Sequence, residues 1–95
     1  MVKILAVCGN GLGSSLMLKI NIASVVKELG AADVEVAHCD LASAASERPD
    51  LVVVANDLAS HFGASQPVIS LAGVMSKVEL KEKLKEFFVK SEREA

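Results

Sequence analysis

The stretch that decides the fold is Val2-Lys3-Ile4-Leu5-Ala6-Val7-Cys8-Gly9-Asn10-Gly11-Leu12-Gly13-Ser14-Ser15. Its first part, residues 2–7, is a nearly continuous apolar run, which is typical of a buried β-strand. The alternating glycines after Cys8 predict a tight loop, and the pattern turns helical from Ser15. A buried strand, a glycine-rich loop and a helix in this order predict the start of a parallel α/β sheet.

The helix predicted after this loop is rich in apolar residues. Some of them recur at helical spacing on one face, which we expect to pack on the core: Leu16, Ile20, Ala23 and Val26. Ser14 or Ser15 is expected to cap the first turn. Gly30 stands where a left-handed residue would end the helix.

The middle of the chain alternates between strand-like and helix-like segments. Three more strands are predicted, at residues 34–36, 51–55 and 67–71. A short helix is expected within 40–48, because Pro49 must stop it. A second short helix is expected to run from a cap at Asp57 to Phe62.

The last helix opens with a capping box, Ser76-Lys77-Val78-Glu79. Its expected core face consists of Leu80, Leu84, Phe87 and Phe88. The tail from Lys90 is expected to fray.

Strands that alternate with helices predict a single α/β domain over residues 1–95. The expected architecture is a doubly wound, four-stranded parallel sheet with helices on both faces. Right-handed crossovers place the loop after the first strand at the carboxyl edge of the sheet, near the point where the strand order reverses. Ligands of such folds bind at that edge, so the glycine loop is the candidate site.

Composition excludes several classes of protein. Hydrophobic residues make up 52% of the 95 residues, and the mean hydropathy is +0.43, which excludes disorder. The longest apolar runs, residues 4–8 and 51–55, are far shorter than the ~18 residues of a membrane-spanning helix. A net charge of -2 without Trp or Tyr argues against a nucleic-acid-binding surface. No export signal precedes Cys8, so we expect a cytoplasmic protein without a disulfide framework.

The candidate site is Cys8 followed by Gly9, Asn10, Gly11, Leu12, Gly13, Ser14 and Ser15. Glycines at this spacing let successive backbone N–H groups point inward and hold a tetrahedral anion at a helix N-terminus. The same partial positive charge lowers the pKa of a thiol placed there. A thiolate beside a phosphate-binding loop can take a phosphoryl group and form phosphocysteine.

Three familiar phosphate-binding loops fit this segment badly. No lysine occurs where a Walker A loop needs one, and Ser14 replaces the third glycine of the dinucleotide fingerprint. Ser14 also occupies the place of the arginine that follows the cysteine of a phosphatase loop. That arginine stabilises the transition state of hydrolysis, so its absence favours a carrier whose phosphocysteine survives until it meets an acceptor.

Residues 4–15, followed by Met17, Leu18 and Lys19, resemble the start of enzyme IIB of the bacterial sugar phosphotransferase system. The likeness is to the lactose/cellobiose IIB superfamily and, within it, to the ascorbate-type IIB proteins. The resemblance implies that a IIA phosphohistidine phosphorylates Cys8, and that residues 9–15 hold the phosphate. The phosphoryl group would then pass to a sugar, ascorbate or a related carbohydrate, bound in the IIC membrane permease. The chain would thus be a protein-phosphocysteine–sugar phosphotransferase component.

Two other functions stay open at this point: a small cysteine-dependent phosphatase, and a non-catalytic module that binds a phosphorylated metabolite. Met17 and Leu18 either pack in the core or form an exposed apolar collar for IIA and IIC. Residues 1–30 carry three lysines and one glutamate, which would favour an acidic or phosphorylated partner.

Other residues suggest functions that the rest of the sequence disfavours. A receiver domain would use an aspartate such as Asp57, but it needs acidic residues where this chain has Cys8. His38 and Cys39 suggest a metal site with Cys8, but adjacent residues of a strand point to opposite faces. We therefore expect no metal and no cofactor, and a half-buried, unreactive thiol at Cys39.

Overall fold

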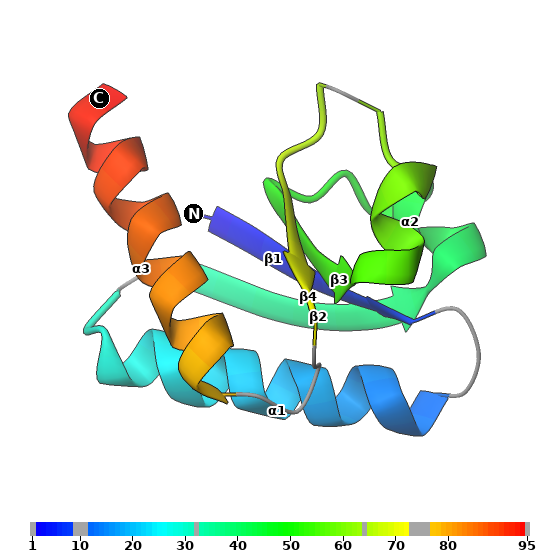
Figure 1. Cartoon of the computed structure of the whole chain (residues 1–95), viewed down its shortest axis with the longest axis horizontal. Helices are drawn as coiled ribbons and strands as arrows, with labels where there is room; N and C mark the ends of the chain where they lie inside the picture. Colours follow the sequence, from blue (N-terminus) through cyan, green and yellow to red (C-terminus); the bar gives the residue numbers. More distant parts are fainter. Residues whose placement is uncertain (1, 9–11, 32, 64, 73–76, 95) are drawn as a thin grey trace.

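The protein, seen here in a computed structural model, is described over residues 2–8, 12–31, 33–63, 65–72 and 77–94. The sheet in this part of the chain consists of β1 (Val2–Cys8), β2 (Val34–Asp40), β3 (Leu51–Ala55) and β4 (Val68–Leu71). All pairings are parallel, in the order β2-β1-β3-β4 (Figure 1). The predicted parallel α/β fold is confirmed, and the strand order reverses at β1.

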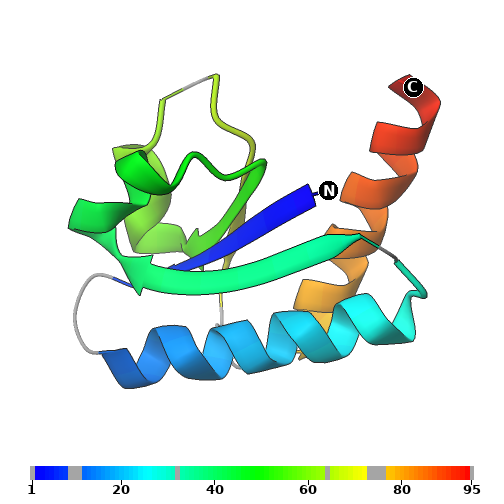
Figure 2. The same ribbon diagram turned by 180° about the vertical axis from the view of Figure 1, so that it is seen from behind.

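Helical segments cover both faces of the sheet. On one face lie α1 (Leu12–Glu28) and α3 (Lys77–Glu94). On the other face lie α2 (Leu41–Glu47) and the 3-10 helix η1 (Asn56–His61). Figures 1 and 2 show the two layers from opposite sides. The thicker α1/α3 layer holds the larger core cluster, and the α2/η1 layer holds the smaller one.

Strand β1 shows why its sequence is a continuous apolar run. Ile4 and Ala6 pack toward α1 and α3, while Leu5 and Val7 pack toward α2 and η1. All four side chains are completely buried. A strand that is covered on both faces does not alternate apolar and polar residues. Its sequence therefore indicates that it is buried, but not which residues point to which face.

Helix α1 buries a different face from the one that the sequence predicts. Its core residues are Leu18, Ile22, Val25 and Val26. Leu16 and Ile20 are 45% and 51% exposed, and Ala23 is exposed as well. Only Val26 of the predicted face is buried. The prediction is wrong because α1 carries apolar residues around most of its circumference, so packing on the sheet selects the face.

The ends of α1 also refine the prediction. The helix begins at Leu12, so Ser14 and Ser15 lie inside its first turn, and neither is its cap. The predicted end is confirmed, since Gly30 adopts a left-handed φ of 71°. Its N–H group donates to the carbonyl of Lys27 at 3.1 Å.

The short helix α2 is bounded by side-chain and backbone signals that act locally. Asp40 has an extended backbone, and its carboxylate accepts a hydrogen bond from the N–H group of Ser43 at 2.8 Å. Arg48 adopts a left-handed conformation with φ of 48° and ends the helix before Pro49. The predicted short helix is confirmed, but β2 extends through Cys39 to Asp40, beyond the predicted strand.

Two other predicted ends are wrong. Helix η1 starts at Asn56 with Ala55 as its N-cap and has no side-chain cap, so Asp57 does not cap it. Helix α3 continues to Glu94 rather than fraying from Lys90. Its predicted core face is confirmed, because Leu80 and Leu84 are fully buried and both phenylalanines pack against the same cluster. Ser76 of the expected capping box lies outside the described residues.

Among the described residues, no helix is both long enough and apolar enough to cross a membrane.

Candidate functional site

Cys8 is the last residue of β1 and lies at the carboxyl edge of the sheet. Strand β1 has β2 on one side and β3 on the other. The chain passes from β1 to β2 on one side, and then from β2 across to β3 on the other side of β1. This is the topological switch point, where open α/β sheets form a crevice for ligands. The fold therefore places the candidate nucleophile where this architecture binds ligands.

The N-terminus of α1 follows Cys8 after a short connection. Leu12, Gly13, Ser14 and Ser15 form the first turn of this helix of 17 residues. The first N–H groups of an α-helix have no acceptor within the helix, and the helix dipole adds partial positive charge there. The first turn carries no acidic side chain. An anion near Cys8 would therefore meet an edge of the sheet that is favourable to negative charge.

The three remaining residues of the predicted phosphate loop, Gly9, Asn10 and Gly11, lie outside the described residues. The inward-pointing ring of N–H groups thus stays a prediction from the glycine spacing. The structure describes the two elements on either side of these residues, the end of β1 and the start of α1 (Figure 1).

Asp40 is a residue of this edge that the sequence reasoning missed. It forms a register pair with Cys8, at the last position of the β1–β2 ladder. Hydrogen bonds from the side chain and the backbone of Ser43 hold the pKa of the Asp40 carboxyl below its ordinary value. The only local signal was an aspartate directly before an Ala/Ser-rich segment, which is typical of a helix cap.

Cys39 and His38 lie on opposite faces of β2. Cys39 packs with the cluster beneath α2 and η1. Val36, which shares the strand face of His38, packs on the α1 side. Burial raises the pKa of the Cys39 thiol, and the carboxylates of Glu47 and Asp40 raise it further. The structure agrees with the expected half-buried thiol, and Cys39 forms no disulfide. Among the described residues, no group of three or more His, Cys, Asp or Glu side chains could hold a metal ion.

The first half of α1 exposes large apolar side chains. Leu16, Met17 and Ile20, which we call the α1 apolar patch, are 45%, 43% and 51% exposed. Leu18 is completely buried and belongs to the core. Of the two residues that the sequence offered as an apolar collar, only Met17 is therefore at the surface. The other members of the patch come from the face that was predicted to be buried.

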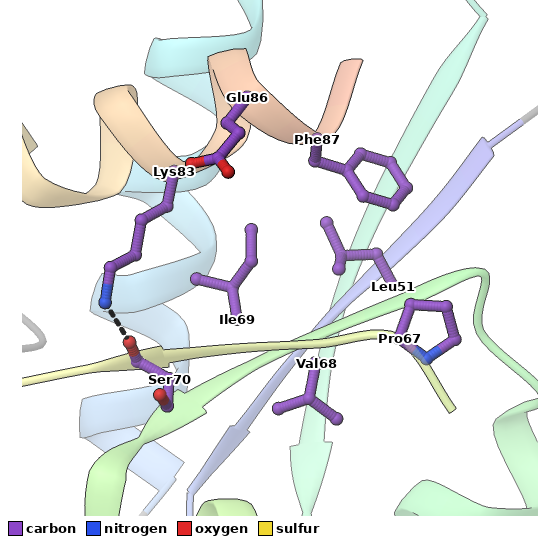
Figure 3. A pocket seen from close by; sticks show the side chains of 8 residues that line it. All are labelled: Leu51, Pro67, Val68, Ile69, Ser70, Lys83, Glu86 and Phe87. Carbon is purple, nitrogen blue, oxygen red and sulfur yellow. Dashed lines mark hydrogen bonds between the residues drawn. The ribbon is translucent and has the colours of Figure 1, made fainter. Parts of the chain in front are cut away.

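Two surface cavities lie away from Cys8. One, of about 430 Å³, lies between β4 and α3, where the Lys83 ammonium group donates a hydrogen bond to the carbonyl oxygen of Ser70 (Figure 3). The other, of about 570 Å³, lies between the end of α2 and the segment after η1, and Arg48 and His61 line it. Among the described residues, those that line the two cavities include neither Cys8 nor a residue of α1.

Comparison with known proteins identifies the family of this chain. The family of the PTS system, lactose/cellobiose-specific IIB subunit, matches residues 3–86. The chain belongs to this family. It is also similar to a protein of Mycoplasma pneumoniae described as the ascorbate-specific PTS system EIIB component. The two are 31% identical over 84 residues, which cover 85% of this chain and 88% of that protein.

Family membership confirms the resemblance that the first 19 residues suggested. The matched region includes part or all of each described strand and helix and ends within α3, so the likeness does not depend on the cysteine loop alone. As a IIB subunit, the chain is a component of a sugar phosphotransferase system, in which IIB proteins work with IIA and IIC components.

Proposed function

We propose that this IIB subunit carries a phosphoryl group on Cys8 between a IIA phosphohistidine and a sugar bound in the IIC permease. The observation that carries the proposal is the position of Cys8, at the carboxyl end of β1, on the switch point and just before the N-terminus of α1. That position offers an anion the N-terminal N–H groups of a long helix. It also favours the thiolate form of the cysteine.

The chemistry consists of two exchanges of one phosphoryl group. In the first, the sulfur of Cys8 attacks phosphorus, the P–N bond of phosphohistidine breaks, and a P–S bond forms. Cys8 attacks as the thiolate, and the departing imidazole of IIA takes up a proton equivalent to the one that the thiol gave up. In the second, a sugar hydroxyl attacks phosphorus, the P–S bond breaks to release the Cys8 thiolate, and a base supplied by IIC takes the hydroxyl proton. Neither exchange requires a metal or a cofactor held by this chain.

The phosphate loop of the proposal consists of residues 9–15. Backbone N–H groups of this loop would hold the phosphoryl oxygens, with help from the hydroxyl groups of Ser14 and Ser15 and the amide of Asn10. Neutral donors suit a group that must be released to an acceptor, because they stabilise it less than a guanidinium would.

The sugar is proposed to be ascorbate or a related carbohydrate. The support is the similarity to the ascorbate-specific component of Mycoplasma pneumoniae. Selection of the sugar would lie in IIC, which binds it. A transport assay with labelled ascorbate and the matching IIC tests this part of the proposal, and transport of another sugar alone would contradict it.

The α1 apolar patch is proposed to dock IIA. Phosphotransfer requires direct contact with the surroundings of Cys8, and the patch lies on the half of α1 that begins beside that edge. Transient interfaces need exposed apolar area of this kind. Lys19 lies in the same stretch of α1, and its charge favours a phosphorylated partner.

Substitution within the patch tests the docking role. The double variant Met17→Gln, Ile20→Gln should raise the KM for phosphorylated IIA by about tenfold, because it removes apolar contact area. Stability should change little, since both side chains are near half exposed. Val89→Gln is the matched control, because Val89 is an exposed apolar residue near the far end of α3. An unchanged KM in the double variant would contradict the docking of IIA on this surface.

Intact-mass analysis tests the proposed carrier role directly. The chain is incubated with phosphoenolpyruvate, the general phosphotransfer proteins and a matching IIA. Wild type and Cys39→Ser should each gain the mass of one phosphoryl group, and Cys8→Ser should gain none. Phosphorylation of Cys8→Ser at the wild-type level would contradict the proposal. Rapid hydrolysis of an aryl phosphate by the isolated chain would instead indicate a phosphatase.

A further inference from the structure

The strand register pairs Asp40 with Cys8, the candidate phosphorylation site. Cys8 and Asp40 are the final pair of the β1–β2 ladder, and neighbouring strands of a sheet lie about 4.8 Å apart. The two residues are 32 positions apart in the sequence, so only sheet pairing brings them together.

The negative charge at this position is fixed in place. The Oδ1 atom of Asp40 accepts a hydrogen bond from the backbone N–H of Ser43 at 2.8 Å. The cap holds the carboxylate at the start of α2. Helix α2 begins at the end of β2, on the carboxyl edge of the sheet (Figure 2). Its lowered pKa means that the group remains ionised throughout the neutral range.

We propose that Asp40 is a positioning residue for phosphotransfer, whose fixed charge destabilises phosphocysteine and so keeps the phosphoryl group transferable. This inference rests on the proposed carrier function of Cys8. Phosphocysteine is an anion, as is the thiolate, and a carboxylate one strand away repels both. Asp40 thus opposes the stabilisation that the α1 N-terminus provides, and the two effects together set how tightly the group is held.

Other ionisable residues lie on the strands and helices around this edge. They are Lys3 on β1, Lys19 on α1, His38 and Cys39 on β2, Glu47 on α2, and Asp57 and His61 in η1. Lys3 and Glu47 form an ion pair with each other at 2.9 Å. Since Lys3 stands near the start of β1, that pair lies toward the amino edge, away from Cys8.

The substitutions Asp40→Asn and Asp40→Ser separate charge from capping. Asparagine and serine cap helices about as well as aspartate, so both variants remove the charge and keep α2. The matched control is Asp33→Asn, which removes the same charge at the opposite end of β2. Asp33 has a left-handed φ of 56°, which asparagine tolerates. The seven-residue strand separates it from Asp40 by roughly 20 Å, since each step along a strand adds about 3.3 Å.

The first measurement is the pH dependence of Cys8 alkylation by iodoacetamide, in chains that also carry Cys39→Ser. The midpoint should fall in both Asp40 variants, with the rate at neutral pH rising about three- to tenfold. It should stay unchanged in Asp33→Asn. A merely structural role of Asp40 would not move this profile.

The second measurement is the phosphotransfer equilibrium between IIA and IIB. In the Asp40 variants it should shift about three- to tenfold toward phosphorylated IIB. If the Asp40 variants are phosphorylated normally, and their equilibrium constant and neutral-pH alkylation rate stay within twofold of wild type, the role of Asp40 is overturned while the carrier function stands. Failure of wild type itself to accept a phosphoryl group would overturn the carrier function, and the transfer role of Asp40 with it.

Discussion

The two edges of the sheet use charge in opposite ways. At the amino edge, the Lys3 ammonium group binds the Glu47 carboxylate at 2.9 Å, and the Lys3 backbone N–H donates to Asp50 at 2.8 Å. The Asp50 N–H in turn donates to the Lys3 carbonyl at 2.9 Å. At the carboxyl edge, the Asp40 carboxylate accepts a hydrogen bond from an N–H group of α2. Helix α1 begins shortly after Cys8 at the same edge.

We interpret the amino edge as structural and propose that the carboxyl edge serves the chemistry. Complementary groups at the amino edge satisfy one another, so they tie β1 to the segment before β3 and leave little field for a ligand. At the carboxyl edge, the α1 N-terminus attracts anions while Asp40 repels them. A group held by such opposed effects can be bound and released, which suits a carrier.

The largest expected effect is a difference in reactivity between the two cysteines. At pH 7, Cys8 should be alkylated by iodoacetamide at least tenfold faster than Cys39. The α1 N-terminus favours the Cys8 thiolate, whereas burial and nearby carboxylates raise the pKa of Cys39. Peptide mapping by mass spectrometry measures both rates, with the urea-unfolded chain as the control in which they converge. Equal alkylation rates in the folded chain would show that Cys8 is not activated relative to Cys39.

A smaller effect is expected from breaking the amino-edge ion pair. Lys3→Met should lower the Tm by a few degrees, because it removes the bonds of the ammonium group to the side chain and the carbonyl of Glu47. Phosphoryl acceptance should stay within twofold of wild type. Thermal unfolding and the phosphotransfer assay measure the two quantities side by side. A large loss of acceptance in a folded Lys3→Met chain would mean that the two edges are coupled.

A weaker effect links the amino edge to Cys39. Glu47→Gln removes a carboxylate that raises the pKa of this thiol, so its alkylation at alkaline pH should begin at a slightly lower pH. Burial would still hold the midpoint above the ordinary range, since it is the largest cause of the shift. The alkylation profile of Cys39 in a Cys8→Ser chain measures this. A midpoint that does not move would show that the Glu47 carboxylate does not contribute to the reactivity of Cys39.

The smallest effect concerns acid stability at the carboxyl edge. The folded-state pKa of Asp40 is lowered, so its capping contribution is present above the ordinary aspartate pKa and is lost as pH falls through the lowered value. Asp40→Asn caps without titrating. Wild type should therefore lose stability on acidification more steeply than Asp40→Asn, in urea unfolding at a series of pH values. Parallel profiles would mean that the Ser43 hydrogen bonds favour neither ionisation state.

Much of the fold was predictable because it follows from local patterns. The buried run before Cys8, the LVVVA run of β3 and the proline after α2 each mark an element by its own composition. The candidate site was predictable in one part, since a cysteine before alternating glycines is a local motif. The caps were harder: Ser14 and Asp57 are good capping residues, yet both lie inside helices that begin earlier.

The sequence by itself determined the strand–loop–helix start, the parallel α/β class and the family of this protein. Each of these is carried by residues close together in the chain, so no distant contact is needed to read them. Only the tertiary structure decided which face of α1 is buried, because that helix is apolar on more than one side and the sheet selects among them. Only the register of β1 with β2 brought Asp40 beside Cys8. Pairing between strands so far apart in the chain is a property of the whole packed sheet, which no local pattern records.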